Sequence, residues 1–312
     1  MVNLLNVSKQ YLDEVNKQPA LHTMTPKEVR RLRGTTLNKQ PIKNANISKI
    51  EDNVISMRDG EKIKIRIYTP HGDGPFPVIV YYHGGGWVLN NIDTCHESCQ
   101  LLSLKTNSIV ISVNYRLAPE YKFPIPVYDA YDSFRWTYNN AKLINGMTDK
   151  ITVMGDSAGA NLATVVTIIN KELQGPKINC QILLYPVTDL SYDSPSYEQF
   201  KVGFGLEKKD MEWFGDYYLN DESEKVNPYV APLRAKDLSK LPPACIIVAE
   251  NDVLRDEGIA YGKRLKEEGV SIDLHIADGL VHSFFTKNEI FNVEIENTLY
   301  LINDYLKKLN EC

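Results

Sequence analysis

A serine flanked by glycines, at an expected strand-to-helix corner, is the feature that most restricts how this chain can fold. Gly155-Asp156-Ser157-Ala158-Gly159 follows an apolar run at 151–154 and precedes residues 160–169, whose length and small side chains are typical of a packed helix. Because so sharp a turn presses backbone segments together, glycine at both ends removes side chains that would collide. The pattern predicts a nucleophilic hydroxyl held above a sheet. An ordinary Gly/Ser/Asp turn is the alternative, and the pentapeptide alone does not decide.

Apolar runs alternate with stretches of helical length along most of the chain. The first two expected strands, 54–57 and 63–68, are joined by Asp59-Gly60, a hairpin signal, so we expect an antiparallel edge. This order predicts an α/β fold with an eight-stranded, mostly parallel sheet flanked by helices. The remaining strands are expected at 78–82, 109–113, 151–154, 182–185, 244–249 and 272–276, and helices at 94–105, 127–142, 160–174, 256–268 and 287–309.

Two segments fall outside this alternation. Residues 1–50 are polar and broken by prolines, and could be either a packing arm or part of a lid. Residues 190–241 hold helix-like, aromatic-rich pieces such as 208–219 but no convincing strand. An insertion of that size between strands is expected over the carboxyl ends of the sheet, where ligands bind. We therefore expect one domain over 51–312, with 190–230 inserted into it.

Charge and cysteine usage exclude several classes of function. The 312 residues carry a net charge of −5 and no long Lys/Arg run, which argues against nucleic acid as a partner. No apolar stretch reaches the roughly 18 residues that span a membrane, and the first residues do not form a signal peptide. The five cysteines are scattered, as in a reducing compartment, so we expect a cytoplasmic protein. Cys95-His96-x-x-Cys99 lacks a second Cys/His pair at finger spacing and is expected to be helical, not a metal site.

A glycine run directly follows the predicted strand at 78–82. Three consecutive glycines in His83-Gly84-Gly85-Gly86-Trp87 have no side chains to cover the backbone, so its N–H groups can approach a ligand oxygen closely. Joined by the Ala158 N–H, these groups would form an oxyanion hole, in which each donor contributes about a hundred- to a thousand-fold in rate. A flexible glycine turn is the alternative. However, the run lies between an early strand and the next helix, where enzymes with a nucleophile elbow have this loop.

A serine nucleophile needs a base, and in this fold the base follows the serine in the chain. Two of the six histidines do so. His275 sits inside a strand-like alternation and is better explained as a sheet residue. His282 follows 278–281, which we expect to be a loop after the last strand. His282 is therefore the predicted base.

The base needs a carboxylate that orients it. Asp252 lies just past the end of the strand expected at 244–249 and is the predicted acid. Glu250, Asp256 and Glu257 are competing carboxylates. Asp256 and Glu257 are better explained as favourable charges at the N-terminus of the following helix.

With these residues in view, the chain resembles the hormone-sensitive-lipase-like family of α/β-hydrolases, the bacterial carboxylesterases with an HGGG loop. The matching stretches are 81–87, 114–120, 155–159 and 252–257, and the resemblance covers nearly the whole chain. It implies an α/β-hydrolase fold without metal or organic cofactor and a helical cap made of 1–50 and 190–230. His83 and the 115–120 stretch would be structural supports. The site that it implies is a triad of Ser157, Asp252 and His282 with oxyanion N–H groups from Gly85, Gly86 and Ala158.

The resemblance also implies the substrate class. A serine carboxylesterase would hydrolyse short- to medium-chain acyl esters through an acyl-enzyme, because a compact cap limits the length of the pocket. An amidase, deacetylase or peptidase would use the same triad, and the sequence does not separate these. A non-catalytic ligand-binding homologue is disfavoured because His282 is present. An exposed edge strand or the last helix could support a homodimer. Six aromatic residues are expected to line the acyl pocket, or else to fill the cap's own core: Trp87, Tyr185, Trp213, Phe214, Tyr217 and Tyr218.

Two positions depart from the family pattern. The family usually has proline after the acid and glycine after the histidine, where this chain has Val253 and Ser283. Val253 removes a rigid turn. Ser283 cannot adopt glycine-only backbone angles cheaply, so we expect the loop around His282 to differ in detail.

Overall fold

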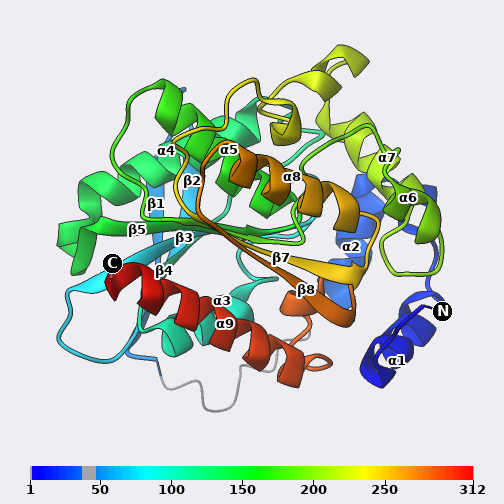
Figure 1. Cartoon of the computed structure of the whole chain (residues 1–312), viewed down its shortest axis with the longest axis horizontal. Helices are drawn as coiled ribbons and strands as arrows, with labels where there is room; N and C mark the ends of the chain where they lie inside the picture. Colours follow the sequence, from blue (N-terminus) through cyan, green and yellow to red (C-terminus); the bar gives the residue numbers. More distant parts are fainter. Residues whose placement is uncertain (1, 37–46, 312) are drawn as a thin grey trace.

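A single twisted sheet organises the part of the chain that the computed structural model describes, residues 2–36 and 47–311 (Figure 1). Within those residues, eight strands lie in the order β1-β2-β4-β3-β5-β6-β7-β8. β2 pairs antiparallel with both β1 and β4, and every other pair is parallel, which confirms the expected antiparallel edge. The strands are β1 (Lys49–Ser56), β2 (Lys62–Thr69), β3 (Phe76–Tyr82), β4 (Ile109–Val113), β5 (Gly146–Asp156), β6 (Gln181–Leu184), β7 (Ala244–Asn251) and β8 (Ile272–Val281).

Helices cover both faces of the sheet. In Figure 1, α3 and α9 lie on one face, and α4, α5 and α8 lie on the other. Residues 37–46 of the predicted 1–50 segment lie outside the described residues. The α-helices are α1 (Asn6–Val15), α2 (Pro26–Thr36), α3 (His96–Thr106), α4 (Ile125–Asn140), α5 (Ala158–Glu172), α6 (Pro195–Gln199), α7 (Lys208–Tyr218), α8 (Arg255–Glu267) and α9 (Asn292–Glu311).

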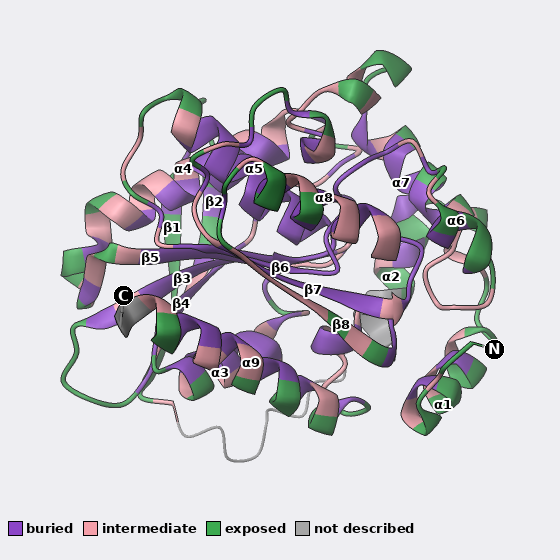
Figure 2. Cartoon of the chain, viewed as in Figure 1, coloured by how far each residue is buried: buried purple, intermediate pink, exposed green. Residues whose placement is uncertain are grey.

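The central strands are buried on both sides, as parallel strands between helix layers must be. In β3, Val78 and Val80 face one core cluster, whereas Ile79 and Tyr81 face the other. Figure 2 shows the same division, with buried residues along the sheet and on the inner faces of the helices. The continuous apolar runs of the sequence are therefore two-sided core strands.

Of the boundaries that differ from the sequence prediction, two lie next to His282. β8 runs to Val281, so 278–281 is strand and not the expected loop; a register shift after Ala249 lets Asn251 pair with Val281. α9 begins at Asn292 and not at 287, because a 3-10 turn over Phe284–Thr286 comes first. Both changes follow from backbone geometry that residue periodicity does not encode.

Residues 2–36 and the 190–230 segment lie together at one end of the sheet, where α1, α2, α6 and α7 gather in Figure 1. His22 donates its backbone N–H to Asp210 Oδ1 at 3.1 Å, and its ring Nδ1 lies 2.8 Å from the same oxygen. Trp213 Nε1 donates to the Met24 carbonyl at 3.0 Å. Parts of the chain almost two hundred residues apart are thus joined directly by hydrogen bonds. Within the described residues, none of the helices has the length and apolar character required to cross a membrane.

Candidate active site

Ser157 occupies the corner between β5 and α5 in a backbone conformation that few residues adopt, with φ 56° and ψ −122°. A Cβ atom on Gly155 would collide with the backbone of Gly159. A Cβ atom on Gly159 would collide with the carbonyl group of Tyr82, at the end of β3. The two glycines are therefore required by the close approach of helix and sheet, and the strained serine is held by its surroundings.

His282 and Asp252 meet Ser157 at the carboxyl ends of the parallel strands. Asp252 follows directly after β7, and His282 follows directly after the neighbouring β8. His282 Nε2 lies 3.0 Å from Ser157 Oγ, and His282 Nδ1 lies 2.6 Å from Asp252 Oδ2. All three side chains are buried. This is the geometry in which an imidazole can take the serine proton while the carboxylate holds its orientation.

Asp252 is itself held in place. Its Oδ1 accepts the backbone N–H of Leu254 at 3.0 Å, and its carbonyl accepts the N–H of Arg255, where α8 begins. Val253, which replaces the expected proline, is fully buried, and its carbonyl accepts the Ser196 hydroxyl at 2.6 Å. The turn is therefore fixed by hydrogen bonds and burial in place of a proline ring.

Ser283 adopts the left-handed conformation, with φ 63° and ψ 14°. This is the region that glycine enters freely and other residues enter at a cost. The chain therefore keeps the turn after His282 without a glycine and retains both contacts of the imidazole.

The glycine loop after β3 lies against Ser157. Gly85 and Gly86 both have positive φ angles, 121° and 59°, and both border the same cavity as the serine. Among the described residues, no backbone carbonyl accepts a hydrogen bond from the Gly85 or the Gly86 N–H. Ala158 is the first residue of α5, and the first N–H groups of a helix have no partner inside it. Three backbone donors are thus available around Ser157.

Asp156 supports this loop, a role that the sequence analysis did not assign. Its Oδ1 accepts the Gly84 N–H at 2.9 Å and the Tyr81 hydroxyl at 2.7 Å. Complete burial raises the pKa of the Asp156 carboxyl, while these two hydrogen bonds act in the opposite direction. The motif places an acidic residue beside the serine, but only the fold shows that its side chain turns back to the glycine loop.

His83 and Tyr115 also stabilise the glycine loop after β3. Their rings stack with centroids 4.4 Å apart, and the Tyr115 hydroxyl donates to the His83 carbonyl at 2.7 Å. His83 Nδ1 lies 2.8 Å from the Gly84 carbonyl oxygen, so this nitrogen carries the proton. Burial lowers the pKa of His83 to about 4. His83 is therefore neutral at physiological pH and braces the loop.

The competing carboxylates bind backbone groups elsewhere. Glu250 accepts the Gly279 N–H at 2.6 Å, and Asp256 accepts the Ser196 N–H at 2.8 Å. Glu257 is buried and accepts the Thr188 N–H at 2.7 Å. Asp256 and Glu257 do lie in the first turn of α8, as expected, but their carboxylates bind backbone N–H groups just before and near the start of residues 190–230. His275 lies on β8 beside Asp273, as a sheet residue.

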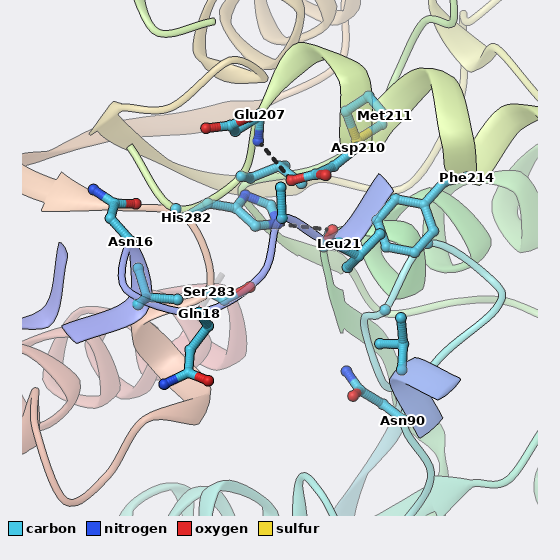
Figure 3. Close-up of a pocket in the computed structure, with 18 of the residues that line it drawn as sticks. Asn16, Gln18, Leu21, Asn90, Glu207, Asp210, Met211, Phe214, His282 and Ser283 are labelled. Atoms are coloured by element: carbon cyan, nitrogen blue, oxygen red, sulfur yellow. Dashed lines mark hydrogen bonds between the residues drawn. The ribbon is translucent and has the colours of Figure 1, made fainter. Parts of the chain in front are cut away.

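A cavity of about 550 Å³ opens over Ser157 and His282 (Figure 3). In the close-up, Leu21 and Phe214 lie on one side of His282, and Asn16, Gln18 and Ser283 lie on the other. Its apolar lining comes from both the N-terminal segment and the 190–230 segment: Leu21, Met24, Val29, Leu206, Met211 and Phe214.

Of the six aromatic residues expected in the pocket, only Phe214 lines this cavity; the prediction needs correction for the other five. Trp87 is fully buried and stacks on Tyr218. Tyr185 packs its ring edge-on to His282, with centroids 4.9 Å apart. Trp213 packs inside the neighbouring segments and donates to the Met24 carbonyl. Residue type and chain position do not determine the direction of these side chains.

The Cys95-His96-x-x-Cys99 stretch is part of α3 and its N-cap, and both cysteines are buried free thiols. His96 Nδ1 lies 2.9 Å from the Tyr68 hydroxyl. Over the described ranges, no group of three His, Cys, Asp or Glu side chains is placed to hold a metal ion.

Known proteins share this sequence and architecture. A family model described as an α/β-hydrolase fold matches residues 79–286. An ethyl acetate hydrolase of Pseudomonas putida is 33% identical over 265 residues, covering 83% of this chain and 82% of its own. An arylesterase of Saccharolobus solfataricus is 36% identical over 239 residues, covering 76% of this chain and 78% of its own. A solved fungal esterase structure from Rhizomucor miehei is 33% identical and covers 99% of this chain and 97% of its own, with a TM-score of 0.94.

Proposed function

This chain belongs to the hormone-sensitive-lipase-like family of α/β-hydrolases, and on that basis we propose that Ser157, His282 and Asp252 are the catalytic triad of a serine carboxylesterase. The carboxylic ester hydrolase class follows from the named relatives. The observation that carries the residue assignment is the unbroken chain of short contacts, 3.0 Å from serine to imidazole and 2.6 Å from imidazole to carboxylate.

In the first step, Ser157 Oγ attacks the ester carbonyl carbon while His282 Nε2 takes the serine proton. The N–H groups of Gly85, Gly86 and Ala158 donate to the oxygen that becomes negatively charged. Asp252 stabilises the imidazolium through Nδ1. Collapse of the tetrahedral intermediate breaks the bond to the alcohol oxygen, which leaves with the proton from His282 and yields an acyl-enzyme.

In the second step, water replaces the alcohol. His282 Nε2 takes a proton from the water as its oxygen attacks the acyl carbon, and the same N–H groups bind the oxyanion. The bond to Ser157 Oγ then breaks, and the proton on His282 returns to the serine. The carboxylic acid is released, and the resting site is restored.

We propose short- to medium-chain acyl esters as substrates. The cavity volume of about 550 Å³ lies within the range of small-molecule sites. Its apolar wall, with Leu21, Met211 and Phe214, suits an acyl chain of modest length. A relative is named ethyl acetate hydrolase, which is consistent with small acyl groups. Faster turnover of emulsified long-chain triglyceride than of short acyl esters would contradict this proposal.

The deciding experiment compares wild-type protein with Ser157→Ala on p-nitrophenyl esters from acetate to octanoate. We expect turnover that depends on chain length and falls by about 10⁴-fold in the variant, the scale of triad knockouts. Equal, weak activity in both proteins would refute the triad and favour a non-catalytic, ligand-binding protein. Matched ester and anilide substrates separate esterase from amidase or peptidase activity, for which the same triad would serve.

The two segments over the site are the proposed cap, with 1–50 as its N-terminal part and 190–230 as its second part. The hydrogen bonds of His22 and Trp213 across the two segments support this division. Deleting the N-terminal residues through 36 should leave the sheet folded while altering chain-length preference, as measured by circular dichroism and by the same ester series.

Location and oligomeric state are also proposals. The free, buried thiols of Cys95, Cys99, Cys180 and Cys245 support a cytoplasmic protein. A homodimer could form along the edge strand β8, where Ile276 is 48% exposed, or along α9, where Tyr300 is 72% exposed. Sedimentation equilibrium of the wild type beside Ile276→Lys and Tyr300→Lys tests both surfaces, and a monomeric wild type would refute the dimer.

A further inference from the structure

Helix α7 of the 190–230 segment touches the glycine loop directly at two points. The ring of Phe214 lies where a Cβ atom of Gly86 would be. One turn further along the helix, Tyr218 stacks on Trp87, with ring centroids 4.2 Å apart and an interplanar angle of 5°. Trp87 follows Gly86 in the chain, so this stack adjoins one of the proposed oxyanion donors.

The 118–123 stretch holds both halves of the stack. The Trp87 carbonyl accepts the Ala118 N–H at 2.9 Å, and the Tyr218 carbonyl accepts the Phe123 N–H at 2.9 Å. The Phe123 ring also meets the Tyr218 ring edge-on, with centroids 5.9 Å apart. The position of the Tyr218 ring is therefore set by the body of the protein as well as by α7.

Ring contact, rather than polar bonding, joins the two side chains. Trp87 and Tyr218 are both fully buried. Among the described residues, neither Trp87 Nε1 nor the Tyr218 hydroxyl has a hydrogen-bond partner. The planar aromatic surface of Tyr218 is thus the property that matters for Trp87, and its hydroxyl is dispensable.

Trp87 also has a strained backbone, with φ 58°. A bulky residue keeps this left-handed conformation only where neighbouring groups leave it no alternative. The flat face of Tyr218 closes one side of the space that the indole occupies. Without that face the indole can move and the φ angle of Trp87 can relax. Gly86, which also has a positive φ angle and whose N–H lies in the peptide that joins it to Gly85, can then shift with the Trp87 backbone.

We propose that Tyr218 is a positioning residue for ester hydrolysis, which holds the Gly86 N–H in its oxyanion-binding orientation through the stack on Trp87. The inference rests on the proposed function, because it requires that Gly85, Gly86 and Ala158 bind the oxyanion. It adds a structural link from α7 to the chemical step, so α7 does more than cover the cavity.

The test compares three variants with the wild type. Tyr218→Leu removes the ring, Tyr218→Phe removes only the hydroxyl, and Tyr217→Leu is the matched control on the same helix. Tyr217 packs against Trp213, with centroids 4.8 Å apart, and does not line the cavity. For each protein we would measure kcat and KM with p-nitrophenyl butyrate, and inhibition by an alkyl trifluoromethyl ketone and by butyrate.

For Tyr218→Leu, we expect kcat to fall by about tenfold or more with KM within about twofold. A displaced Gly86 N–H binds the oxyanion of the transition state less well, whereas it contributes little to binding the uncharged ester. Inhibition by the ketone, which forms a tetrahedral oxyanion on serine, should weaken in parallel, whereas butyrate should bind as before. Tyr218→Phe and Tyr217→Leu should retain the wild-type kcat.

Three results would overturn the inference. They are an unchanged kcat in folded Tyr218→Leu, a loss confined to KM, or an equal loss in Tyr217→Leu. If Tyr218→Leu does not fold, Tyr218→Met replaces it as a ringless side chain of larger volume. A wild type whose activity survives Ser157→Ala would instead refute the proposed function, so the two failures are distinguishable.

Discussion

The ring of Phe214 occupies the space that a Cβ atom on Gly86 would need. One residue lies in α7 and the other in the glycine loop after β3, so a side chain of the 190–230 segment borders a proposed oxyanion donor. Gly86 also has φ 59°, which an L-residue adopts at a cost. The residue at this position must therefore have no Cβ atom in the space of the Phe214 ring and must adopt a positive φ angle. Glycine meets both requirements.

Gly86→Ala should lower kcat by about a hundredfold or more, the scale of losing one oxyanion donor. The added methyl group must displace either Phe214 or the loop. The double variant Gly86→Ala with Phe214→Ala separates the two requirements, because it restores the space but not the backbone freedom. We expect partial recovery of kcat with p-nitrophenyl butyrate. Full recovery would mean that the backbone angle is unimportant, and wild-type activity in the single variant would exclude Gly86 from the site.

Asp252→Asn should lower kcat by about 10³- to 10⁴-fold, because the amide cannot stabilise the imidazolium and favours the wrong tautomer. Glu250→Gln is the matched control. Glu250 lies two residues earlier and binds the Gly279 N–H, which a glutamine oxygen can still accept. Steady-state turnover of p-nitrophenyl butyrate should therefore stay within a few-fold of wild type in the control. The reverse ranking would assign the acid to Glu250.

Acid should destabilise the protein through His83. Its pKa is about 4 in the folded protein, against an ordinary value of 6.5, because burial disfavours the charged ring. The unfolded chain therefore binds the proton more readily, and protonation favours unfolding. The stabilising contribution is complete above pH 6.5 and is lost as the pH falls toward 4, by about 1.4 kcal/mol per pH unit within that interval.

The matched variant for this prediction is His83→Asn, whose amide can still donate to the Gly84 carbonyl but does not titrate. Urea unfolding at pH values of about 5 and about 7.5 measures the free energy of unfolding in each protein. We expect the wild type to lose more stability at the lower pH than the variant does. Parallel losses in both proteins would show that other groups dominate acid unfolding.

The left-handed backbone of Ser283 predicts a graded series at that position. Ser283→Gly should leave stability unchanged or raise it by up to about 1 kcal/mol, since glycine adopts this conformation without strain. Ser283→Val should lower stability by about 1–2 kcal/mol, because a β-branched residue is poorly tolerated there. Thermal unfolding of the three proteins checks the order. Equal stability for valine and glycine would show that the turn relaxes at little cost.

The sequence by itself determined the fold class and indicated the three side chains that the structure brings together, Ser157, Asp252 and His282. The order of apolar runs and helices specifies a mostly parallel sheet, because local periodicity reflects which faces are buried. The glycines around Ser157 could be predicted because close backbone contact admits no other residue. Asp252 and His282 could be predicted because the carboxyl ends of parallel strands lie along one edge of the sheet.

Only the tertiary structure decided the directions of the aromatic and acidic side chains. Trp87, Tyr185 and Trp213 do not line the cavity, Asp156 accepts the Gly84 N–H, and Glu257 is buried and accepts the Thr188 N–H. Each of these directions depends on contacts between residues far apart in the chain, which no local pattern contains. The proposed reacting residues lie in short sequence motifs and could be recognised there. The shape of the cavity, in contrast, results from how distant segments pack.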